Sequence, residues 1–381
     1  MMIIGNAKLF SSVVLSGFIT MKSQKKQVSI WTIILIILLL IAVALLVLSR
    51  VIDGFALFYA TNVYPIWQGT LGRLASLFPF SLSELTIYLV PLLIIINLIS
   101  VIIKPTGRKI KRFLVRLLFV LSLFFLLYEA NCGVNYYNRG FAQSEKIKPV
   151  DGEVDKDILV RFCKFTIENL KSDSESRQGT AIYPSGEALE QEAVTAMKKL
   201  GEAYPSLSGY YPKPKRILNS RPFSNMEVTG IYSPLFIEAN YNGEMPGLNY
   251  PFTLCHELSH LKGYMNEGEA NYIGWLACME SENQEFNRSA YIISWLYAGS
   301  DLYRIDKDLY RELRSSLPDD VIQEIEEDRD FWNNHKTKAA EVQDKVNDSY
   351  LKSNGQEAGI QTYNQVVSLM LAWYRDNGDY S

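Results

Sequence analysis

Three side chains within five residues of this sequence have the types and spacing of a metal site. His256, Glu257 and His260 form an HExxH box in the stretch PFTLCHELSHLKGYMNEGEANYIGWLAC, which runs from residue 251 to 278. On a helix, positions i and i+4 lie on one face, so the two imidazoles can converge on a single metal ion. Imidazole suits Zn²⁺, and a catalytic zinc site usually has three protein ligands plus a water molecule. The box therefore predicts two zinc ligands, His256 and His260, and requires a third.

The glutamate of the box has the position of a general base. Glu257 directly follows the first histidine, which places its carboxylate beside the open coordination position. There we expect it to take a proton from a metal-bound water molecule and to pass it to a leaving amine. An HExxH box also occurs by chance on ordinary amphipathic helices. However, the chain has only three histidines and two of them are in the box, which argues against a purely structural use of both.

The third ligand is expected from a second helix that follows at once. Gly263 predicts the end of the first helix, because glycine is the usual residue just beyond a helix C-terminus. Asn266 is a typical N-cap, and Glu269 three residues later completes a capping-box pattern. Both Glu267 and Glu269 lie in the first turn of this helix. Glu269 has a structural explanation as the capping partner and Glu267 has none, so Glu267 is the first choice for the metal.

The pair HELSH and EGEAN, which is HExxH followed by ExxAN, resembles the Glu-zincin metallopeptidases. The resemblance implies that His256, His260 and Glu267 are the zinc ligands and that Glu257 is the base. It also implies that Asn271 buttresses a ligand histidine, which is a supporting role with a clear physical purpose. Only six residues separate His260 from Glu267, fewer than in most Glu-zincins, so the two helices must form a tight hairpin.

Three features indicate a narrower family than the Glu-zincins as a whole. They are this short spacing, the segment EANYNGEMP upstream and the apolar segments near the N-terminus. From about Val28 onward, the chain resembles an uncharacterised family of bacterial membrane-anchored HExxH proteins, known as a domain of unknown function. That resemblance implies an architecture but no substrate.

Three apolar runs predict transmembrane helices at about 30–50, 85–103 and 113–129, because each approaches the ~20 residues needed to cross a bilayer. Lysines precede the first run, and five basic residues lie between the second and third. By the positive-inside rule these flanks are cytoplasmic, so residues 131–381 are expected on the outer face of a bacterial cytoplasmic membrane. The aromatic-rich segment 55–80 fits either a position among lipid headgroups or a loop packed on the outer domain.

The first 27 residues are the least defined part of the sequence. Their apolar stretch is too short to span a bilayer, and Met21 followed by three nearby lysines is a more natural start for a membrane protein. An overextended start and a short interfacial segment both remain open.

Residues 131–381 read as a mainly helical (α+β) zincin-like domain with a small sheet. The segment from Gly230 to Gly247 has strand character with turn signals at both ends. In metallopeptidases of this type, a strand just before the HExxH helix forms the cleft edge and pairs with an extended substrate. We therefore expect Ile237, Glu238, Ala239 and Asn240 to line the cleft, with an ordinary sheet strand as the alternative.

Composition excludes some classes of function. The formal net charge is −3, which gives no indication of a nucleic-acid partner. Four cysteines have no spacing typical of a disulfide framework or a cysteine zinc site, and the sequence does not decide whether any pair is bridged. His335 lacks surrounding cysteines or a carboxylate cluster of ligand type, which favours a surface or capping role.

Together these features predict a membrane-anchored, zinc-dependent metallopeptidase acting on a peptide or protein, with a lipid bilayer as its surroundings. A tyrosine is the natural donor to a tetrahedral oxyanion, but the chain has 23 of them. The alternatives are a catalytically inactive zinc-binding sensor or scaffold, and a membrane component in which the box is accidental. Almost no charge lies within the three apolar runs, which argues against a transporter.

Overall fold

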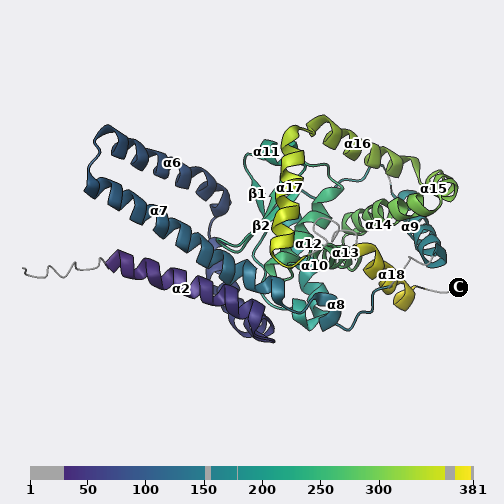
Figure 1. Cartoon of the computed structure of the whole chain (residues 1–381). Helices are drawn as coiled ribbons and strands as arrows, with labels where there is room; N and C mark the ends of the chain where they lie inside the picture. Colours follow the sequence, from purple (N-terminus) through teal and green to yellow (C-terminus); the bar gives the residue numbers. More distant parts are fainter. Residues whose placement is uncertain (1–29, 151–155, 178, 357–364, 379–381) are drawn as a thin grey trace, which may run out of the picture.

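The structure is a computed structural model that describes residues 30–150, 156–177, 179–356 and 365–378. The uncertain segment 1–27 and its alternatives lie outside these residues. Three long helices project from one side of a larger, mainly helical part that holds a small sheet (Figure 1). These are α2 (Ile30–Val51), α6 (Leu82–Ile103) and α7 (Gly107–Tyr128).

The described chain has three helices that are long and apolar enough to cross a membrane: Ile30–Val51, Leu82–Ile103 and Gly107–Tyr137. Each of α2, α6 and α7 has 22 residues, or about 33 Å at 1.5 Å per residue, which matches a hydrocarbon core of about 30 Å. The third helix begins six residues before its predicted start. Thr106 caps it by accepting a hydrogen bond from the Lys109 amide (3.3 Å), so most basic residues of the predicted link lie on α7 itself.

Short helical turns connect the long helices. Between α2 and α6 they are α3 (Phe55–Phe58), η1 (Tyr59–Val63), α4 (Tyr64–Trp67), η2 (Gln68–Gly72) and α5 (Arg73–Ala75); after α7 come η3 (Glu129–Gly133), η4 (Val134–Tyr137) and α8 (Phe141–Ser144).

The connection between α2 and α6 packs against the large part of the molecule. Tyr64 is 2% exposed, and its hydroxyl donates to the carbonyl of Leu261 (2.8 Å). Gln68 donates to the same carbonyl (3.1 Å). Leu77 on the same connection is 75% exposed. One side of this segment is thus a packed loop while the other presents apolar side chains, and the predicted boundary near residue 130 does not separate two independent cores.

The large part of the molecule is built from α9 (Lys156–Ser176), α10 (Gly186–Ala203), η5 (Pro205–Leu207), β1 (Lys215–Ile217), α11 (Arg221–Asn225), β2 (Gly230–Ser233), β3 (Glu238–Asn242), α12 (Asn249–Leu261), α13 (Glu267–Met279), α14 (Gln284–Ile305), α15 (Lys307–Arg314), α16 (Asp319–His335), α17 (Lys338–Ser353) and α18 (Gln365–Asn377). Helices α12 and α13 lie at its centre (Figure 1), and their apolar side chains form much of the core. The mainly helical class with a small sheet is therefore confirmed.

The sheet has three strands in the order β1-β3-β2, with β1 parallel and β2 antiparallel to β3. In this register Tyr232 lies opposite Ala239, and Lys215 opposite Asn240. The strand that precedes the HExxH helix is therefore central, hydrogen-bonded to a neighbour on each side.

Helix α6 is joined to this sheet by two buried carboxylates. Glu238 accepts hydrogen bonds from the Ser83 amide (2.9 Å) and from Leu82 (3.1 Å) at the N-terminus of α6, and it pairs with the Lys215 ammonium (2.6 Å). Glu84 on α6 accepts from the amide of Leu218 just after β1 (2.9 Å). The end of α6 is thus fixed to two strands.

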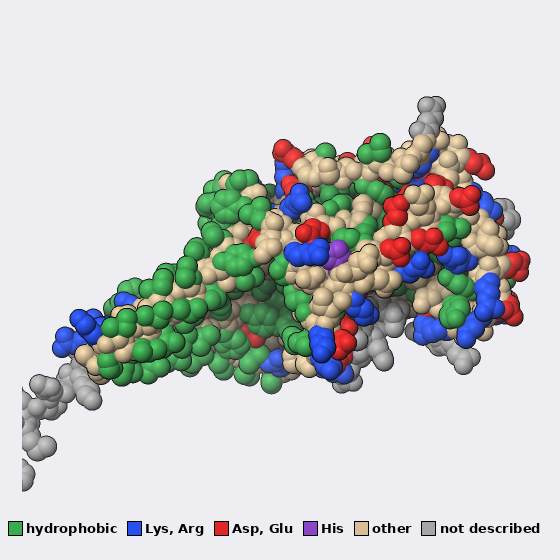
Figure 2. Space-filling model, turned by 90° about the horizontal axis from the view of Figure 1, so that it is seen from above, with side chains coloured by type: hydrophobic (Ala, Val, Ile, Leu, Met, Phe, Trp, Pro, Cys, Tyr) green, Lys and Arg blue, Asp and Glu red, His purple; other side chains and the backbone are tan. Residues whose placement is uncertain are grey.

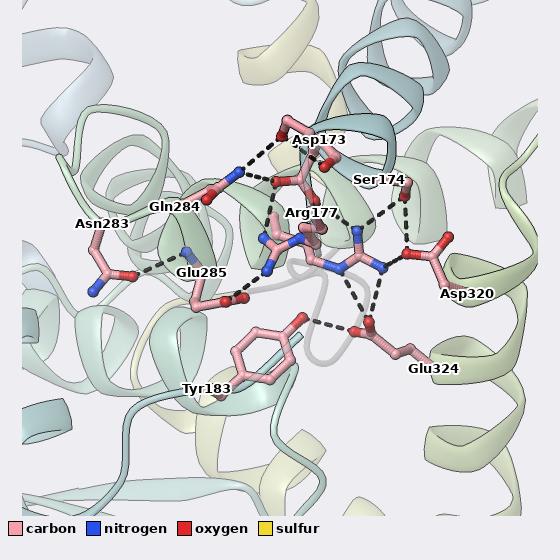
Figure 3. Close-up of polar contacts among 11 residues, drawn as sticks. Asp173, Ser174, Arg177, Tyr183, Asn283, Gln284, Glu285, Asp320 and Glu324 are labelled. Carbon is pink, nitrogen blue, oxygen red and sulfur yellow. Dashed lines mark hydrogen bonds and ion pairs between the residues drawn. The ribbon is translucent and has the colours of Figure 1, made fainter. Parts of the chain in front are cut away.

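A buried charge cluster joins α9, α14 and α16 (Figure 3). Arg288 has no exposed side-chain surface, and its guanidinium pairs with Asp173 (2.6 Å), Asp320 (2.7 Å) and Glu324 (2.8 Å). Arg177 pairs with the same Asp173 at 2.8 Å. The carboxylates outnumber the arginines, and the positive charge at the centre holds three helices together.

Candidate metal centre

The structure brings His256, His260 and Glu267 into one cluster. One ligand atom from each lies within 4.8 Å of the others. The Glu267 carboxylate oxygen is 3.4 Å from the Nε2 atoms of both histidines. The two imidazole rings are 4.6 Å apart and nearly perpendicular. Two histidines one turn apart on α12 and the first residue of α13 therefore point to a common centre.

The predicted tight hairpin is formed by a glycine turn at the end of α12. Gly263 has φ of 94°, a left-handed conformation that favours glycine. Its amide donates to the His260 carbonyl (2.8 Å), and the Tyr264 amide donates to the Ser259 carbonyl (3.2 Å). This pair of bonds is the Schellman motif, which satisfies the free carbonyls at the helix end. It reverses the chain so that Glu267 returns to the histidines.

A second glycine allows the two helices to approach each other. A Cβ atom at Gly274 of α13 would lie 2.9 Å from the backbone nitrogen of His256 and 3.1 Å from its Cα. Contacts this short with backbone atoms force one helix to move. The close packing of α13 on the metal-facing helix therefore depends on the missing side chain.

The two candidate glutamates of α13 have different positions. Asn266 is the N-cap, accepting from the Glu269 amide at 3.0 Å, as predicted. The Glu269 carboxylate does not return to Asn266, however, and instead accepts from the amides of Phe141 (2.8 Å) and Ala142 (3.0 Å) at the start of α8. Glu269 thus holds the start of α8 against α13. Of the two glutamates, Glu267 is the one that reaches the histidines.

Glu257 lies beside the cluster and against strand β2. It is 4% exposed, and a Cβ atom at Gly230 of β2 would be 2.6 Å from its carboxylate oxygen. Burial raises the pKa of Glu257 to about 7, although the nearby His256 and His260 oppose this shift. Its Oε2 atom has no hydrogen-bond partner among the described residues. The group is therefore a proton acceptor in the neutral pH range with one unused oxygen.

The charges of the three clustered residues support one another. Burial alone would lower the pKa of His260, but the adjacent Glu267 carboxylate outweighs it and raises the pKa to about 9. Burial likewise opposes ionisation of Glu267, and the two histidines outweigh it and hold its pKa well below the usual range. Positive charge beside Glu267 therefore favours its ionised form.

Hydrogen bonding orients one histidine of the cluster. Nδ1 of His260 lies 2.8 Å from the Tyr264 carbonyl oxygen, which can only accept, so Nδ1 carries the proton and Nε2 faces the cluster. This arrangement is typical of metal-bound histidine. Nδ1 of His256 is buried without a partner among the described residues. The predicted buttress Asn271 donates instead to the hydroxyl of Tyr297 (3.3 Å). The resemblance implied that Asn271 supports a histidine of the cluster. In the structure the Tyr264 carbonyl supports His260, and Asn271 binds Tyr297.

The predicted cleft strand has a different place. Ile237, Glu238, Ala239 and Asn240 are each at most 3% exposed, and β3 is the central strand. A strand paired on both sides has no free edge for a peptide backbone, so the expectation that these four residues form the cleft edge is wrong. The edge strand next to Glu257 is β2, whose Gly230 lies against that carboxylate. The ordinary-strand alternative describes β3 correctly.

Two tyrosines near the cluster were not singled out by sequence. The ring centroid of Tyr232 is 6.5 Å from that of His260, but its hydroxyl donates to the Asn131 carbonyl (2.9 Å) and contacts Tyr64 (3.0 Å). Tyr297 on α14 accepts from Asn271, and the Glu267 charge adds to burial in raising its pKa to about 12. No local pattern marks either residue, because both reach the centre through tertiary packing.

The remaining candidates are not members of the cluster. His335 contacts the Arg221 guanidinium (2.6 Å) and the Phe331 carbonyl (2.8 Å), in agreement with a capping role at the end of α16. All four cysteines are buried and free.

The His₂Glu set matches a common catalytic zinc site in the type and number of its donors. Comparison with known proteins gives a family for the chain. A search of curated proteins found no significant match, and a search of solved structures found none either. Residues 59–371 match the family described as "Protein of unknown function (DUF3810)", a stretch that begins in the connection between α2 and α6 and ends in α18. The chain therefore belongs to the DUF3810 family.

Proposed function

We propose that this protein is a membrane-anchored, zinc-dependent metallopeptidase with Glu257 as its general base. The observation that carries the proposal is the convergence of His256, His260 and Glu267 within 4.8 Å, with the Glu257 carboxylate buried beside them. Zinc is favoured over other divalent ions because two imidazoles and one carboxylate are its usual catalytic ligands.

When bound, zinc would polarise a substrate carbonyl and lower the pKa of a water molecule to about 7. His256 and His260 would bind it through Nε2, and Glu267 through its carboxylate. Glu257, with a raised pKa and an unused oxygen, would accept the proton of the attacking water and return it to the leaving amine. Tyr297 is the favoured donor to the oxyanion, because the Tyr232 hydroxyl already donates to a carbonyl.

We further propose that α2, α6 and α7 span a bacterial cytoplasmic membrane. Basic residues gather at the end of α6 and α7 that is distant from the large part of the molecule, where Figure 2 shows blue side chains at the tip of the apolar helices. By the positive-inside rule this end is cytoplasmic, and the metal centre lies on the outer side.

An inactive zinc-binding sensor or scaffold is the second candidate. It is favoured by the burial of the site, since His260 and Glu267 are each 8% exposed and Glu257 is 4% exposed. A peptidase then needs a motion that admits its substrate, whereas a sensor does not.

The first test is the zinc content of the full-length protein purified in detergent. The full chain is required because the connection between α2 and α6 is part of the core. One zinc per chain is expected in the wild type, with loss in Glu267→Gln and retention in Glu269→Gln, which keeps one of the two hydrogen bonds to α8. A wild type without zinc, or equal retention in both variants, refutes the ligand set.

The second test separates peptidase from sensor. Glu257→Gln should keep its zinc and lose hydrolysis of a fluorogenic peptide library, because an amide is not a proton acceptor at neutral pH. A Glu257→Gln protein that keeps zinc and the full biological activity of the wild type would favour the sensor.

A further inference from the structure

A cavity of about 720 Å³ lies between α6, α7 and the first turn of α2, at the end of these helices where the basic residues lie. Its volume is within the usual range for sites of small molecules. Most of its wall is apolar, formed by residues that include Trp31, Leu93, Ile94, Phe113, Phe119 and Val120. Four basic side chains also line it: Arg108, Lys111, Arg112 and Arg116.

Arg116 is the member of this set that lies within the apolar part of α7. It is three residues beyond the predicted start of the span at residue 113, or about 5 Å along the axis. Its guanidinium donates to the Asn97 side-chain oxygen of α6 (2.7 Å), and Asn97 in turn donates to the Leu93 carbonyl (2.8 Å). The second bond fixes the amide orientation, so Arg116 is held across the cavity. Long basic side chains near the end of a membrane helix generally turn toward the interface, so an arginine held on a neighbouring helix is unusual.

No carboxylate within residues 85–128 balances this charge. The sequence from residue 85 to 128 contains neither Asp nor Glu, although it carries all four basic residues of the cavity. The partner that the structure gives Arg116 is the neutral amide of Asn97. The cavity is therefore an apolar slot with an uncompensated positive rim at one end.

We propose that this cavity binds one anionic phospholipid, with the phosphate at Arg112 and Arg116 and an acyl chain along the apolar wall. The guanidinium fork matches phosphate oxygens, and basic pockets between membrane helices on the cytoplasmic side are suited to anionic headgroups. The inference goes beyond the proposed function. It shares with it only the insertion of the three helices in a membrane, and it requires neither zinc nor hydrolysis.

The test is lipid binding to the full-length protein in detergent, followed by native mass spectrometry. Phosphatidylglycerol is compared with phosphatidylcholine of identical acyl chains, and phosphatidylglycerol should bind more tightly. One basic residue near a headgroup contributes about 1 kcal/mol to binding. Arg116→Gln should therefore weaken the binding of phosphatidylglycerol about fivefold and leave the binding of phosphatidylcholine unchanged. Arg116→Lys keeps the charge and should retain more than half of the affinity.

Lys104→Gln is the matched control, because it removes the same charge at the same end of the helices from a residue that does not line the cavity. It should change the affinity less than twofold. Equal binding of the two lipids, or equal effects of Lys104→Gln and Arg116→Gln, would overturn the proposal in favour of general surface attraction.

A second readout locates the acyl chain and does not depend on Arg116. Trp31 lines the cavity and packs edge to face on Phe119 with 6.0 Å between ring centroids. Phosphatidylglycerol with a brominated chain should quench Trp31 fluorescence, as measured by the difference between the wild type and Trp31→Phe. If bound lipid leaves the Trp31 component unquenched, the cavity is not its site.

Discussion

Removal of the central arginine of the buried charge cluster gives a sharp test of the fold. In Arg288→Met an apolar side chain of similar length replaces a guanidinium with no exposed surface. Asp173 would retain Arg177, and Asp320 is 37% exposed and can be solvated. Glu324 is 11% exposed and would keep only the Tyr183 hydroxyl (2.8 Å). The cost is therefore dominated by one buried carboxylate that loses its charged partner.

Breaking a buried ion pair by removing one partner costs about 3–5 kcal/mol. For a folded part of about 250 residues, 1 kcal/mol shifts the melting temperature by about 2–4 °C, so Arg288→Met should melt about 6–20 °C lower. The control is Arg304→Met on the same helix, whose side chain is 64% exposed and pairs with Asp301. An exposed pair is worth at most about 1 kcal/mol. Thermal unfolding in detergent, followed by near-UV circular dichroism, measures both shifts, and equal shifts would refute the reasoning.

The same cluster predicts a pH dependence. Burial opposes ionisation of Asp173, but hydrogen bonds from Arg177 and Arg288 outweigh it and lower its pKa below the ordinary value near 3.9. A lowered pKa in the folded state stabilises the protein above pH about 4, and this contribution is lost as the pH falls through the folded-state pKa. The wild type should therefore lose more stability than Arg288→Met when the pH is lowered below 4. A parallel loss in the two proteins would contradict this assignment.

Three further predictions concern the metal helices and their supports. Gly274→Ala places a methyl group 2.9 Å from the His256 backbone nitrogen, so it should destabilise the fold by about 1–3 kcal/mol. It should also weaken zinc binding in a chelator competition, and an unchanged zinc affinity would refute the close-approach argument. Glu238→Gln leaves the buried Lys215 ammonium without its carboxylate partner and should cost about 3 kcal/mol in thermal unfolding, whereas an unchanged melting temperature would show that the link from α6 to the sheet is dispensable. Tyr297→Phe should keep zinc but lower the turnover number of peptide hydrolysis tenfold or more, and full activity would remove it as the oxyanion donor.

Much of the candidate metal centre could be predicted from local sequence. The HExxH spacing predicts two histidines on one helical face, and Gly263 and Asn266 mark the end of one helix and the start of the next. These signals are local, because helix periodicity and capping act within a few residues. The preference for Glu267 over Glu269 as the residue that reaches the histidines followed from the same reasoning. The three apolar helices were predicted from length and composition alone, which are the properties that matter for a bilayer.

Contacts between distant segments were decided by the tertiary structure alone. Strand β3 becomes central because β1, 25 residues earlier in the sequence, pairs with the side that β2 leaves free. The hydrogen bond of Asn271 to Tyr297 and the attachment of Glu269 to α8 also depend on partners more than 20 residues away in sequence. The packing of Tyr64 against Leu261 joins segments 197 residues apart. No residue pattern encodes which strand becomes central or which hydroxyl faces an amide, because these pairings depend on how whole helices and strands pack around a shared core.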